Sequence, residues 1–382
     1  MLFAFSNHPV SRGNNLFGEF FGELTRFLES EIEELNVVVM PDFFLDRLIS
    51  LDCDVKTFSE NLDNIAEKKG GSLDGIEQTE IRGGNAINTA SALAALGVTV
   101  TPIVCTSEFG LQIIKFYFKP FSVNLSHIKI LERLSITTAL EFRTEREKAN
   151  VMLRDVGALA DFGPNDLDNE DFKAIENADY VCVFNWAGTR RLGTELAKSV
   201  FRHVRTRGKG KTYYDTADPS PNKEEIPKMV KTVLQSKYID VLSVNENEAI
   251  CYASKLSSEI EKLGKKFRFE ESAKESARIL ASHLSARVDL HTTNFSATFT
   301  KKGETFVPAF KVPVLRATGA GDAWNAGNIL GDAFGLSDYC RLALANAVAA
   351  YYISNPEGKH PTREQLIKFC EKMKLKKRSL TN

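Results

Sequence analysis

Hydrophobic and polar positions change their spacing several times along this chain, and each change marks a different predicted element. In residues 16–35 (LFGEFFGELTRFLESEIEEL) the apolar side chains fall at helical spacing. These positions are Phe17, Phe20, Phe21, Leu24, Phe27 and Leu28. From Asn36 the pattern becomes β-branched runs, NVVVM and then TVTPIVCT, separated by a small-residue helix (NAINTASALAALG). We therefore expect residues 1–35 to be a helical extension packed on a body that begins with strands.

The middle of the chain repeats one strand-and-helix unit. Three apolar runs end in a polar residue: YVCVFN at Asn185, KTYYD at Asp215 and DVLSVN at Asn245, which are 30 residues apart (185 to 215 to 245). This interval is the length of one βα unit, so the pattern predicts parallel strands in a doubly wound α/β sheet, with VDLHTT as a further strand. Ligands of such sheets bind outside the carboxyl ends of the strands, where these polar residues gather.

Two stretches depart from that repeat. Residues 48–82 are polar and contain glycine, and TTALEFRTEREKANVMLRD is typical of two strands around a charged turn at Thr144–Glu147. We expect a small antiparallel element, apart from the main sheet, from residues 48–82 and 136–153. The basic residues 366–382 are expected to be a solvated tail.

Composition excludes several classes of function. The chain has 382 residues with a net charge of -1 and 43% hydrophobic residues, which is ordinary for a soluble protein and argues against a surface that coats nucleic acid. Its six cysteines form no C-x-x-C pair and mostly lie in apolar runs, as expected in a reducing compartment. With no signal-like start and no apolar run of membrane-spanning length, we expect a cytoplasmic protein with no membrane partner.

The segment LRATGAGDAWNAG (315–327) places a small-residue turn before a helical pattern. The backbone N–H groups of Gly319, Ala320 and Gly321 would converge on one point, and the helix dipole adds positive potential there. Asp322 cannot bind the anion that such a point attracts, but it can act as a base beside a phosphate. A simple glycine-rich turn with Asp322 as a cap is the structural alternative.

A second small-residue segment, IRGGNAINTASALAALG, contains the first predicted helix of the body and the turn before it. Gly83 and Gly84 allow a close approach of the backbone, and Asn85 and Asn88 can present amides at the helix start. A turn followed by a capped packing helix would give the same pattern.

Two further sites follow predicted strands. In VNENEA, Asn245 and Glu248 lie three residues apart, and an amide with a carboxylate suits Mg²⁺ held through water and shared with substrate phosphates. Early glutamates at a helix N-terminus explain the same residues without a metal. Asp42 and Asp46, past the first strand, are candidates to bind hydroxyl groups or to act as caps.

Taken together, these segments resemble the PfkB family of carbohydrate and nucleoside kinases. GGNAINTASALAALG and ATGAGDAWNAG are similar to the two family signatures, and NENE is similar to the family's N-x-x-E element. The resemblance covers residues 36–365. It implies a ribokinase-like fold, in which helices flank a doubly wound, mainly parallel sheet and a small β lid covers the acceptor.

The resemblance also implies an activity. Family members transfer the γ-phosphoryl group of ATP to a hydroxyl group, and by position Asp322 would be the catalytic base and Gly319–Gly321 the anion hole. The remaining implied roles are acceptor binding by Asp46, Gly83, Gly84 and Asn88, Mg²⁺ and phosphate binding by Asn245 and Glu248, and nucleotide binding by Thr292 and Asn346. Lid closure would exclude water, and a homodimer is compatible with the family.

At three positions this chain departs from the family pattern, and there the family's residue roles do not carry over directly. Arg316-Ala317 replaces the usual Asp-Thr, whose Asp helps to hold a monovalent cation, so we hypothesise that Arg316 supplies the positive charge and no such ion is needed. Asn294 stands where the nucleotide strand usually has glycine, and Pro41 stands where the first strand commonly ends in glycine.

The substrate stays open among three alternatives. A sugar is favoured because the predicted lid is acidic and has Phe58 but no tryptophan, whereas a nucleoside would favour aromatic residues. Arg82, Arg143 and Arg146 could hold a phosphate on the acceptor. The third alternative is a kinase-like ligand sensor without catalysis, against which the intact Gly319–Asp322 segment argues.

Overall fold

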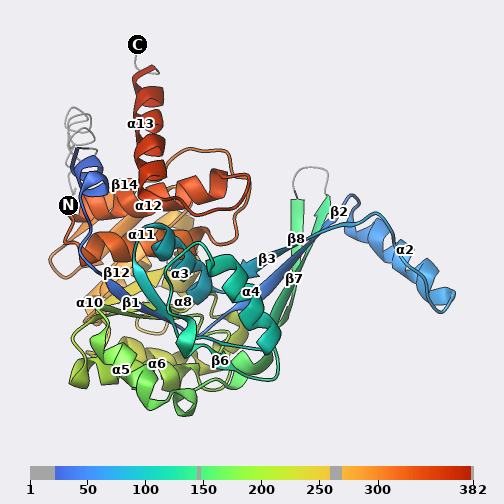
Figure 1. The fold of residues 1–382 in the computed structure, drawn as a ribbon, viewed down its shortest axis with the longest axis horizontal. Coiled ribbons are helices and arrows are strands. Elements are labelled where there is room, and N and C mark those ends of the chain that lie inside the picture. The colour runs from blue at the N-terminus through green and yellow to red at the C-terminus, as the bar shows by residue number, and fades with distance from the viewer. Residues whose placement is uncertain (1–21, 144–147, 259–268, 380–382) are drawn as a thin grey trace, which may run out of the picture.

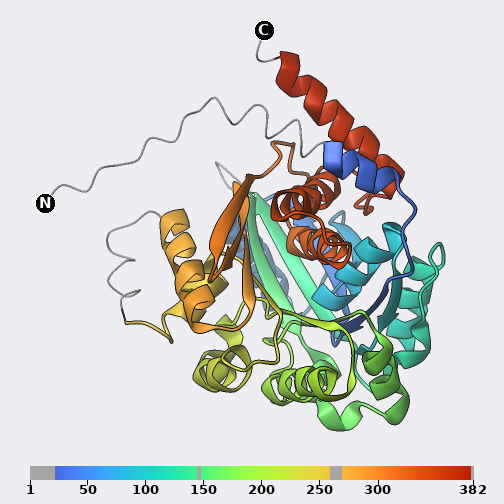
Figure 2. The same ribbon diagram turned by 90° about the vertical axis from the view of Figure 1, so that its left-hand side faces the viewer.

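An eight-stranded sheet lies at the centre of the body, and helices cover both of its faces (Figures 1 and 2). The structure is a computed structural model that describes residues 22–143, 148–258 and 269–379. The strand order is β14-β13-β12-β11-β10-β9-β1-β4, and all neighbours from β4 to β12 are parallel. The strands are β1 (Asn36–Met40), β4 (Thr99–Pro102), β9 (Tyr180–Phe184), β10 (Lys211–Asp215), β11 (Val241–Val244), β12 (Arg287–His291), β13 (Phe295–Thr300) and β14 (Gly303–Pro308).

The apolar runs of the sequence form the buried centre of this sheet. Every residue of β1 from Val37 onward and every residue of β9 is buried, because helices lie on both faces of a parallel sheet. The prediction of a mainly parallel, doubly wound sheet is confirmed, and β12 is the strand expected from VDLHTT.

Two hydrophobic clusters fill the space between the sheet and its helices. One packs against α5, α6, α7, α8 and α10, and the other against α3, α4, α11, α12 and α13. The bounds of the first group are Asn169–Asn177, Gly193–Arg207, Ile226–Met229, Glu246–Ala253 and Phe269–His283. Those of the second group are Asn85–Ala95, Glu108–Phe118, Ala320–Ala333, Asp338–Ser354 and Arg363–Ser379.

A second sheet extends away from the body, as Figure 1 shows. Its order is β3-β2-β7-β8, from β2 (Phe44–Leu51), β3 (Glu77–Gly83), β7 (Ser135–Arg143) and β8 (Lys148–Asp155). At its far end lies α2 (Val55–Glu67), a helix with no buried residue. The sequence analysis did not predict this helix, although Val55, Phe58, Leu62 and Ile65 recur at helical spacing and Asp54 provides an N-cap.

Two expectations are corrected by the structure. TVTPIVCT is not one strand: β4 ends at Pro102, and β5 (Cys105–Thr106) pairs with β6 (Lys129–Ile130) in a separate two-stranded sheet. The solvated tail does not start at residue 366: residues 366–379 continue α13, and Leu366 and Cys370 are buried in the second hydrophobic cluster.

Residues 22–29 form a helix that packs beside α11 and α13. Leu24 and Leu28 are buried, and the Phe27 ring lies 5.6 Å from that of Phe334. The other three apolar positions expected on this helix, Phe17, Phe20 and Phe21, lie outside the described residues.

Candidate active site

Asp322 lies in the first turn of α11 and is buried beneath the start of α3. Its two carboxylate oxygens accept hydrogen bonds from the side-chain amides of Asn85 (2.8 Å) and Asn88 (3.0 Å). Burial raises the pKa of Asp322 well above its ordinary value, an effect that the amides oppose and nearby Asp215 and Asp42 reinforce. The site therefore holds a strongly basic carboxylate in a fixed orientation.

The start of α3 is fixed by a second buried carboxylate. Asp42 accepts hydrogen bonds from the backbone N–H groups of Asn85 and Ala86, both at 2.8 Å, and from the Asn185 amide at 2.7 Å. The chain can bend there because Gly84 has a φ of 94°, and a side chain on it would meet the Phe43 backbone at 2.9 Å. Asp42 thus positions the helix that orients Asp322. These hydrogen bonds support the role of Asp42 as a helix cap rather than as a ligand of a substrate hydroxyl group.

The turn before Asp322 leaves two backbone N–H groups free. Gly319 is the N-cap of α11 with a φ of 84°, and Tyr352 packs so closely that a side chain there would meet its hydroxyl at 2.8 Å. The N–H group of Ala320 donates to the Ala317 carbonyl (3.2 Å), whereas those of Gly319 and Gly321 find no acceptor among the described residues. Of the three N–H groups expected to bind an anion, that of Ala320 is thus engaged within the turn, and those of Gly319 and Gly321 have no protein acceptor among the described residues.

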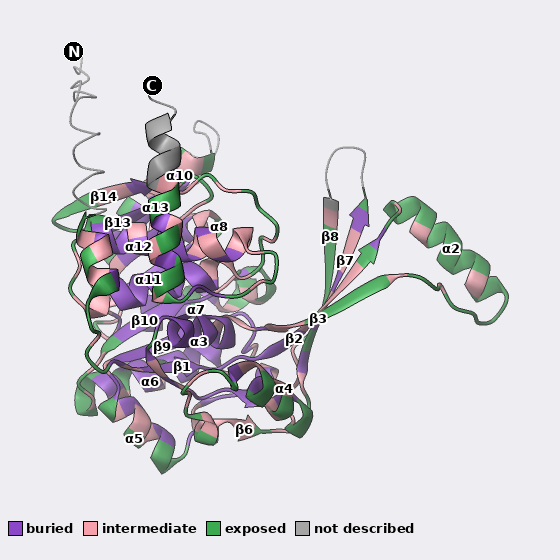
Figure 3. Ribbon diagram, turned by 45° about the horizontal axis from the view of Figure 1, so that its top comes forward, coloured by how far each residue is buried: buried purple, intermediate pink, exposed green. Residues whose placement is uncertain are grey.

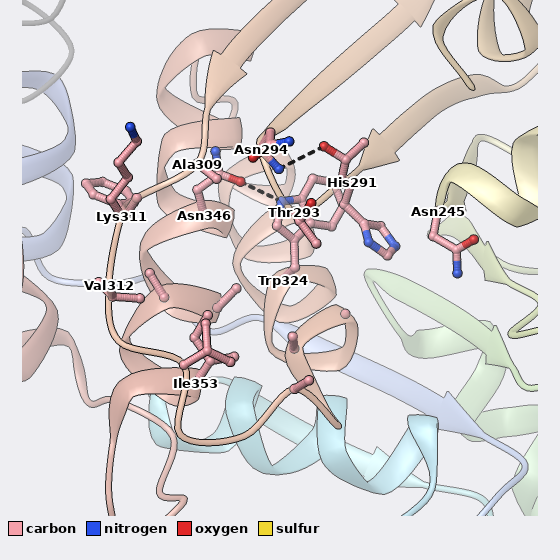
Figure 4. A pocket seen from close by; sticks show the side chains of 18 of the residues that line it. Asn245, His291, Thr293, Asn294, Ala309, Lys311, Val312, Trp324, Asn346 and Ile353 are labelled. Carbon is pink, nitrogen blue, oxygen red and sulfur yellow. Dashed lines mark hydrogen bonds between the residues drawn. The ribbon is translucent and has the colours of Figure 1, made fainter. Parts of the chain in front are cut away.

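A cavity of about 490 Å³ opens beside this turn (Figure 4). Ala320, Gly321 and Trp324 line it on the side of α11, and Asn245 and Glu246 line it from the start of α8. Its other end is largely apolar and is lined by Phe310, Val312, Val314, Ala349 and Ile353. One end can therefore receive a flat apolar group, and the other end meets the helix N-terminus.

Asn245 and Glu248 form a capping box at the start of α8. The Asn245 backbone and side-chain N–H groups both donate to the Glu248 carboxylate (3.0 and 2.8 Å), and the Glu248 N–H group donates back to Asn245 (3.0 Å). Burial raises the pKa of Glu248 well above its ordinary value. A cation in the cavity would stabilise the ionised carboxylate, so the pair fits a magnesium ion bound through water.

The two predicted nucleotide residues both line the cavity. Thr292 closes the turn from β12 to β13 by donating to the Phe295 carbonyl (2.8 Å). Asn346 accepts from the Trp324 indole N–H (3.0 Å) and donates to the Pro308 carbonyl (3.2 Å). Both side chains are held by the protein, so they shape the wall of the cavity.

Asp46 lies in β2 of the second sheet, where its carboxylate covers Gly83. Burial raises its pKa to about 6, against a hydrogen bond from Thr137 and the charge of Arg154. These three residues are direct neighbours across strands β2, β7 and β8. A polar row therefore crosses this sheet next to the start of α3.

The arginines proposed for an anionic acceptor lie in different settings. Arg143 pairs with exposed Asp52 (2.6 Å), and Arg146 lies outside the described residues. Arg82 donates to His360 Nδ1 (2.9 Å). Arg316 donates to the Pro356 carbonyl (2.9 Å) and lies against Gly358, close to the turn that precedes Asp322. Its positive charge is thus built into the loop beside the anion hole.

Several site residues were missed by the sequence reasoning. Asn325 accepts from Tyr213 and Ser243 and donates to Asp215 at 2.7 Å, so it ties α11 to the ends of two strands. His291 ends β12 and lines the cavity. A polar residue at the end of an apolar strand is the same signal that marked Asn185 and Asp215.

The fold is that of a ribokinase-like protein. Residues 52–365 match the sequence model described as pfkB family carbohydrate kinase, and the chain belongs to that family. It is therefore an enzyme of the carbohydrate kinase class. No curated protein matches the chain.

Solved structures show the same fold at low sequence identity. A ribokinase from Cryptococcus neoformans in complex with ADP has 15% identity and a TM-score of 0.66 over 88% of this chain and 99% of that one. Arabidopsis thaliana ribokinase, complexed with ribose and ATP, has 16% identity and a TM-score of 0.64 over 89% and 99%. The Methanocaldococcus jannaschii nucleoside kinase has 16% identity and a TM-score of 0.62 over 89% and 100%.

Among the described helices, none combines the length and apolar character needed to cross a membrane.

Proposed function

We propose that the protein transfers the γ-phosphoryl group of ATP to a hydroxyl group of a sugar or sugar derivative. The observation that carries the proposal is the Asp322 carboxylate, which two asparagine amides orient beside the free N–H groups of a helix N-terminus at the mouth of a cavity. That arrangement provides a base and an anion site side by side, which phosphoryl transfer requires.

Asp322 takes the proton of the acceptor hydroxyl. Because burial raises its pKa, the ionised carboxylate is a stronger base than an exposed one, and a general base works best when its pKa approaches the working pH. Asn85 and Asn88 keep both oxygens in place and donate to the ionised form. The acceptor oxygen then forms its bond to the γ-phosphorus as the bond to the ADP oxygen breaks.

The N–H groups of Gly319 and Gly321 would bind the oxygens of the transferred group, with the dipole of α11 behind them. The adenine ring would lie in the apolar end of the cavity, against Phe310, Val312 and Ile353. Mg²⁺, when bound, neutralises charge on the phosphates. Asn245 and Glu248 would orient its water ligands.

The acceptor would lie between α3 and the second sheet, bound by Asp46, Gly83, Gly84 and Asn88. The second sheet, with residues 48–82 and 136–153, would act as a lid that excludes water during transfer. We favour a sugar because the polar row of Asp46, Thr137 and Arg154 offers hydrogen bonds to hydroxyl groups. A nucleoside, or ligand sensing without transfer, would use the same scaffold.

The test is phosphoryl transfer from ATP and Mg²⁺ to a panel of sugars, sugar phosphates and nucleosides, with Asp322→Asn alongside. We expect one acceptor class to react and the variant to lose about 10²–10⁴-fold in kcat, as expected for loss of a general base. The variant should keep its thermal stability and bind ATP as the wild type does. ATP binding with no transfer to any acceptor would favour the sensor.

Potassium is varied in the same assay. Because the Arg316 guanidinium lies beside the anion-hole turn, we expect equal rates in potassium and in tetramethylammonium salts of the same ionic strength. A requirement for potassium would contradict the proposed role of Arg316.

A further inference from the structure

His291 is a half-buried residue whose Nε2 atom is itself buried and has no hydrogen-bond partner among the described residues. It ends β12, at the edge of the sheet where the other strand-end polar residues meet. Those other residues are engaged: Asn185 donates to Asp42 (2.7 Å), and Asp215 accepts from Asn325 (2.7 Å). An unpaired buried nitrogen costs free energy, so its place at a ligand cavity needs an explanation.

The surroundings of His291 point to an anionic ligand. Its ring lies 5.0 Å from the Trp324 ring at an angle of 34°, and Figure 4 shows it between Trp324 and Asn245 at the cavity. The Cε1 atom would lie 3.3 Å from a β-carbon on Gly321, so the ring edge faces the backbone whose N–H group is free. The imidazole is therefore placed where a group bound at the start of α11 would contact it.

The basic groups that line the cavity are few. Only Lys311 and His291 carry basic side chains among the described residues that line it, and Lys311 follows Phe310 on the apolar side. Three phosphate groups bound in this cavity would carry several negative charges. Of these two lining residues, His291 is the one beside the anion-hole turn, whereas Arg316 approaches that turn from the loop outside the cavity lining.

We propose that His291 is a catalytic residue whose ring N–H group donates a hydrogen bond to the phosphate chain of the donor at the γ-phosphoryl group. This role rests on the proposed ATP-dependent transfer. In that reaction the acceptor proton goes to Asp322, the new oxygen–phosphorus bond forms, and the bond between the γ-phosphorus and the ADP oxygen breaks with its electron pair on ADP. The N–H group stabilises the negative charge that moves through these oxygens.

A purely structural role for His291 predicts something different. A histidine kept only for packing on Trp324 would be replaced by phenylalanine without loss, because the ring and its stacking are retained. A residue that donates to phosphate would be replaced by glutamine, which keeps an N–H donor, but not by phenylalanine. The two substitutions therefore separate the two roles.

Nucleotide binding by the full-length protein tests the proposal without any need for turnover. The chain has two tryptophans, so Trp186→Phe leaves Trp324, inside the cavity, as the only indole reporter. Adenosine, ADP and ATP with Mg²⁺ are titrated into this background and into its His291→Phe and His291→Gln forms. His283→Phe, at an exposed site on α10, is the matched control.

We expect His291→Phe to weaken ATP binding about 10- to 100-fold, the range for a hydrogen bond to a charged group, and to leave adenosine binding within about twofold. His291→Gln should recover most of the ATP affinity. Equal losses for adenosine and ATP, or no loss for either, would overturn the role of His291 while nucleotide binding stands. A wild type that binds no nucleotide would overturn the proposed function itself and the role with it.

Discussion

The second sheet has longer strands than the central sheet of the body, and the two sheets also differ in how they are covered. Helices cover the faces of the central sheet, and most residues of its strands are buried, apart from those of the edge strand β14. The second sheet leaves Val151, Met152 and Leu153 exposed. The helix α2 at its tip has no buried residue, and most of its ribbon is green in Figure 3. The body can therefore hold the base rigid, whereas the second sheet is held by few contacts and is suited to move.

The same contrast separates the two carboxylates that we assign to the acceptor. Asp322 is fixed by two amides from α3 inside the body. Asp46 lies in the second sheet, half-buried, and its environment changes whenever that sheet moves. A rigid base and a movable hydroxyl ligand would allow the acceptor to enter before the site closes.

The largest expected effect compares how much an ion pair contributes to the free energy of unfolding in the body and in the second sheet. Arg341, in the body, is buried and donates to Asp289 (3.1 Å), Thr298 (2.6 Å) and Asp338 (2.8 Å). Arg341→Met should lower the free energy of unfolding by about 3–5 kcal/mol, because it leaves Asp289 buried with one partner fewer. Urea unfolding followed by circular dichroism measures the loss.

The matched control is Arg47→Met in the second sheet. Arg47 pairs with Glu80 across strands β2 and β3, with about half of each side chain exposed (42% and 51%), so its loss should cost less than about 1 kcal/mol. Similar losses for the two variants would contradict the contrast between the regions.

The loss at Arg341 should also depend on pH. Burial alone would raise the pKa of Asp289, but the guanidinium groups of Arg287 and Arg341 outweigh it and hold that pKa well below its usual range. A depressed pKa gives stability that is present above the unfolded-state value and lost as pH falls below it. The deficit of Arg341→Met should therefore be full at pH 7 and shrink below about pH 4.

The next largest expected effect is a change of about tenfold in kcat/KM with pH. It tests whether Asp46, whose pKa is raised to about 6, binds the acceptor. Ionised Asp46 accepts hydrogen bonds from acceptor hydroxyl groups, so kcat/KM for the acceptor should rise about tenfold between pH 5 and pH 7. The carboxyl group binds its proton more tightly in the folded state, so its contribution to stability falls as pH rises from about 4 to about 6. In Asp46→Asn both changes should disappear.

Asp52→Asn, at an exposed position paired with Arg143, is the control for Asp46 and should keep the wild-type profile. A profile with the same inflection in Asp46→Asn would assign the titration to another group, with Asp322 the first to test. Comparing the pH profiles of kcat and kcat/KM separates the two carboxylates. Titration of the proposed base Asp322 should change kcat, whereas titration of an acceptor-binding Asp46 should change mainly kcat/KM.

The contrast between the regions also explains how far the sequence could predict the structure. The parallel strands were predictable because continuous apolar runs ending in Asn185, Asp215 and Asn245 have no other use than burial. The family signatures identified the turn at Gly319–Asp322 for the same reason: small residues in that order leave the backbone open. Both signals are local in the sequence.

Features that depend on distant contacts were not predictable. Nothing near His291 in the sequence shows that Nε2 lacks a partner, and the hydrogen bonds of Asn325 join α11 to two strands more than 80 residues away. The helix α2 was missed for a different reason. Val55, Phe58, Leu62 and Ile65 fall at helical spacing, but they are few and lie in a mostly polar stretch, which was interpreted as part of the small antiparallel element.

The smallest expected effect concerns α2 itself and tests whether the tip of the second sheet serves the site. Strands β2 and β3 are antiparallel neighbours, with Ser50 opposite Glu77, so a short glycine-containing turn can replace residues 52–76. Among the described side chains, Phe142 loses a ring contact with Phe58 (5.5 Å) and Arg143 loses Asp52. Neither contact reaches the body, so we expect the free energy of unfolding to change by less than about 1 kcal/mol and kcat/KM by less than about threefold.

Sedimentation velocity on the same deletion variant gives this prediction its second readout. If the exposed faces of the second sheet and α2 join two copies of the chain, the deletion should lower the sedimenting mass by half while activity per chain is kept. If the chain is monomeric, the mass should fall only by that of the deleted residues. A large loss of stability or of activity in the deletion variant would mean that the tip of the second sheet packs on the body during turnover. The contrast between a rigid body and a loosely held second sheet would then apply only before the substrates bind.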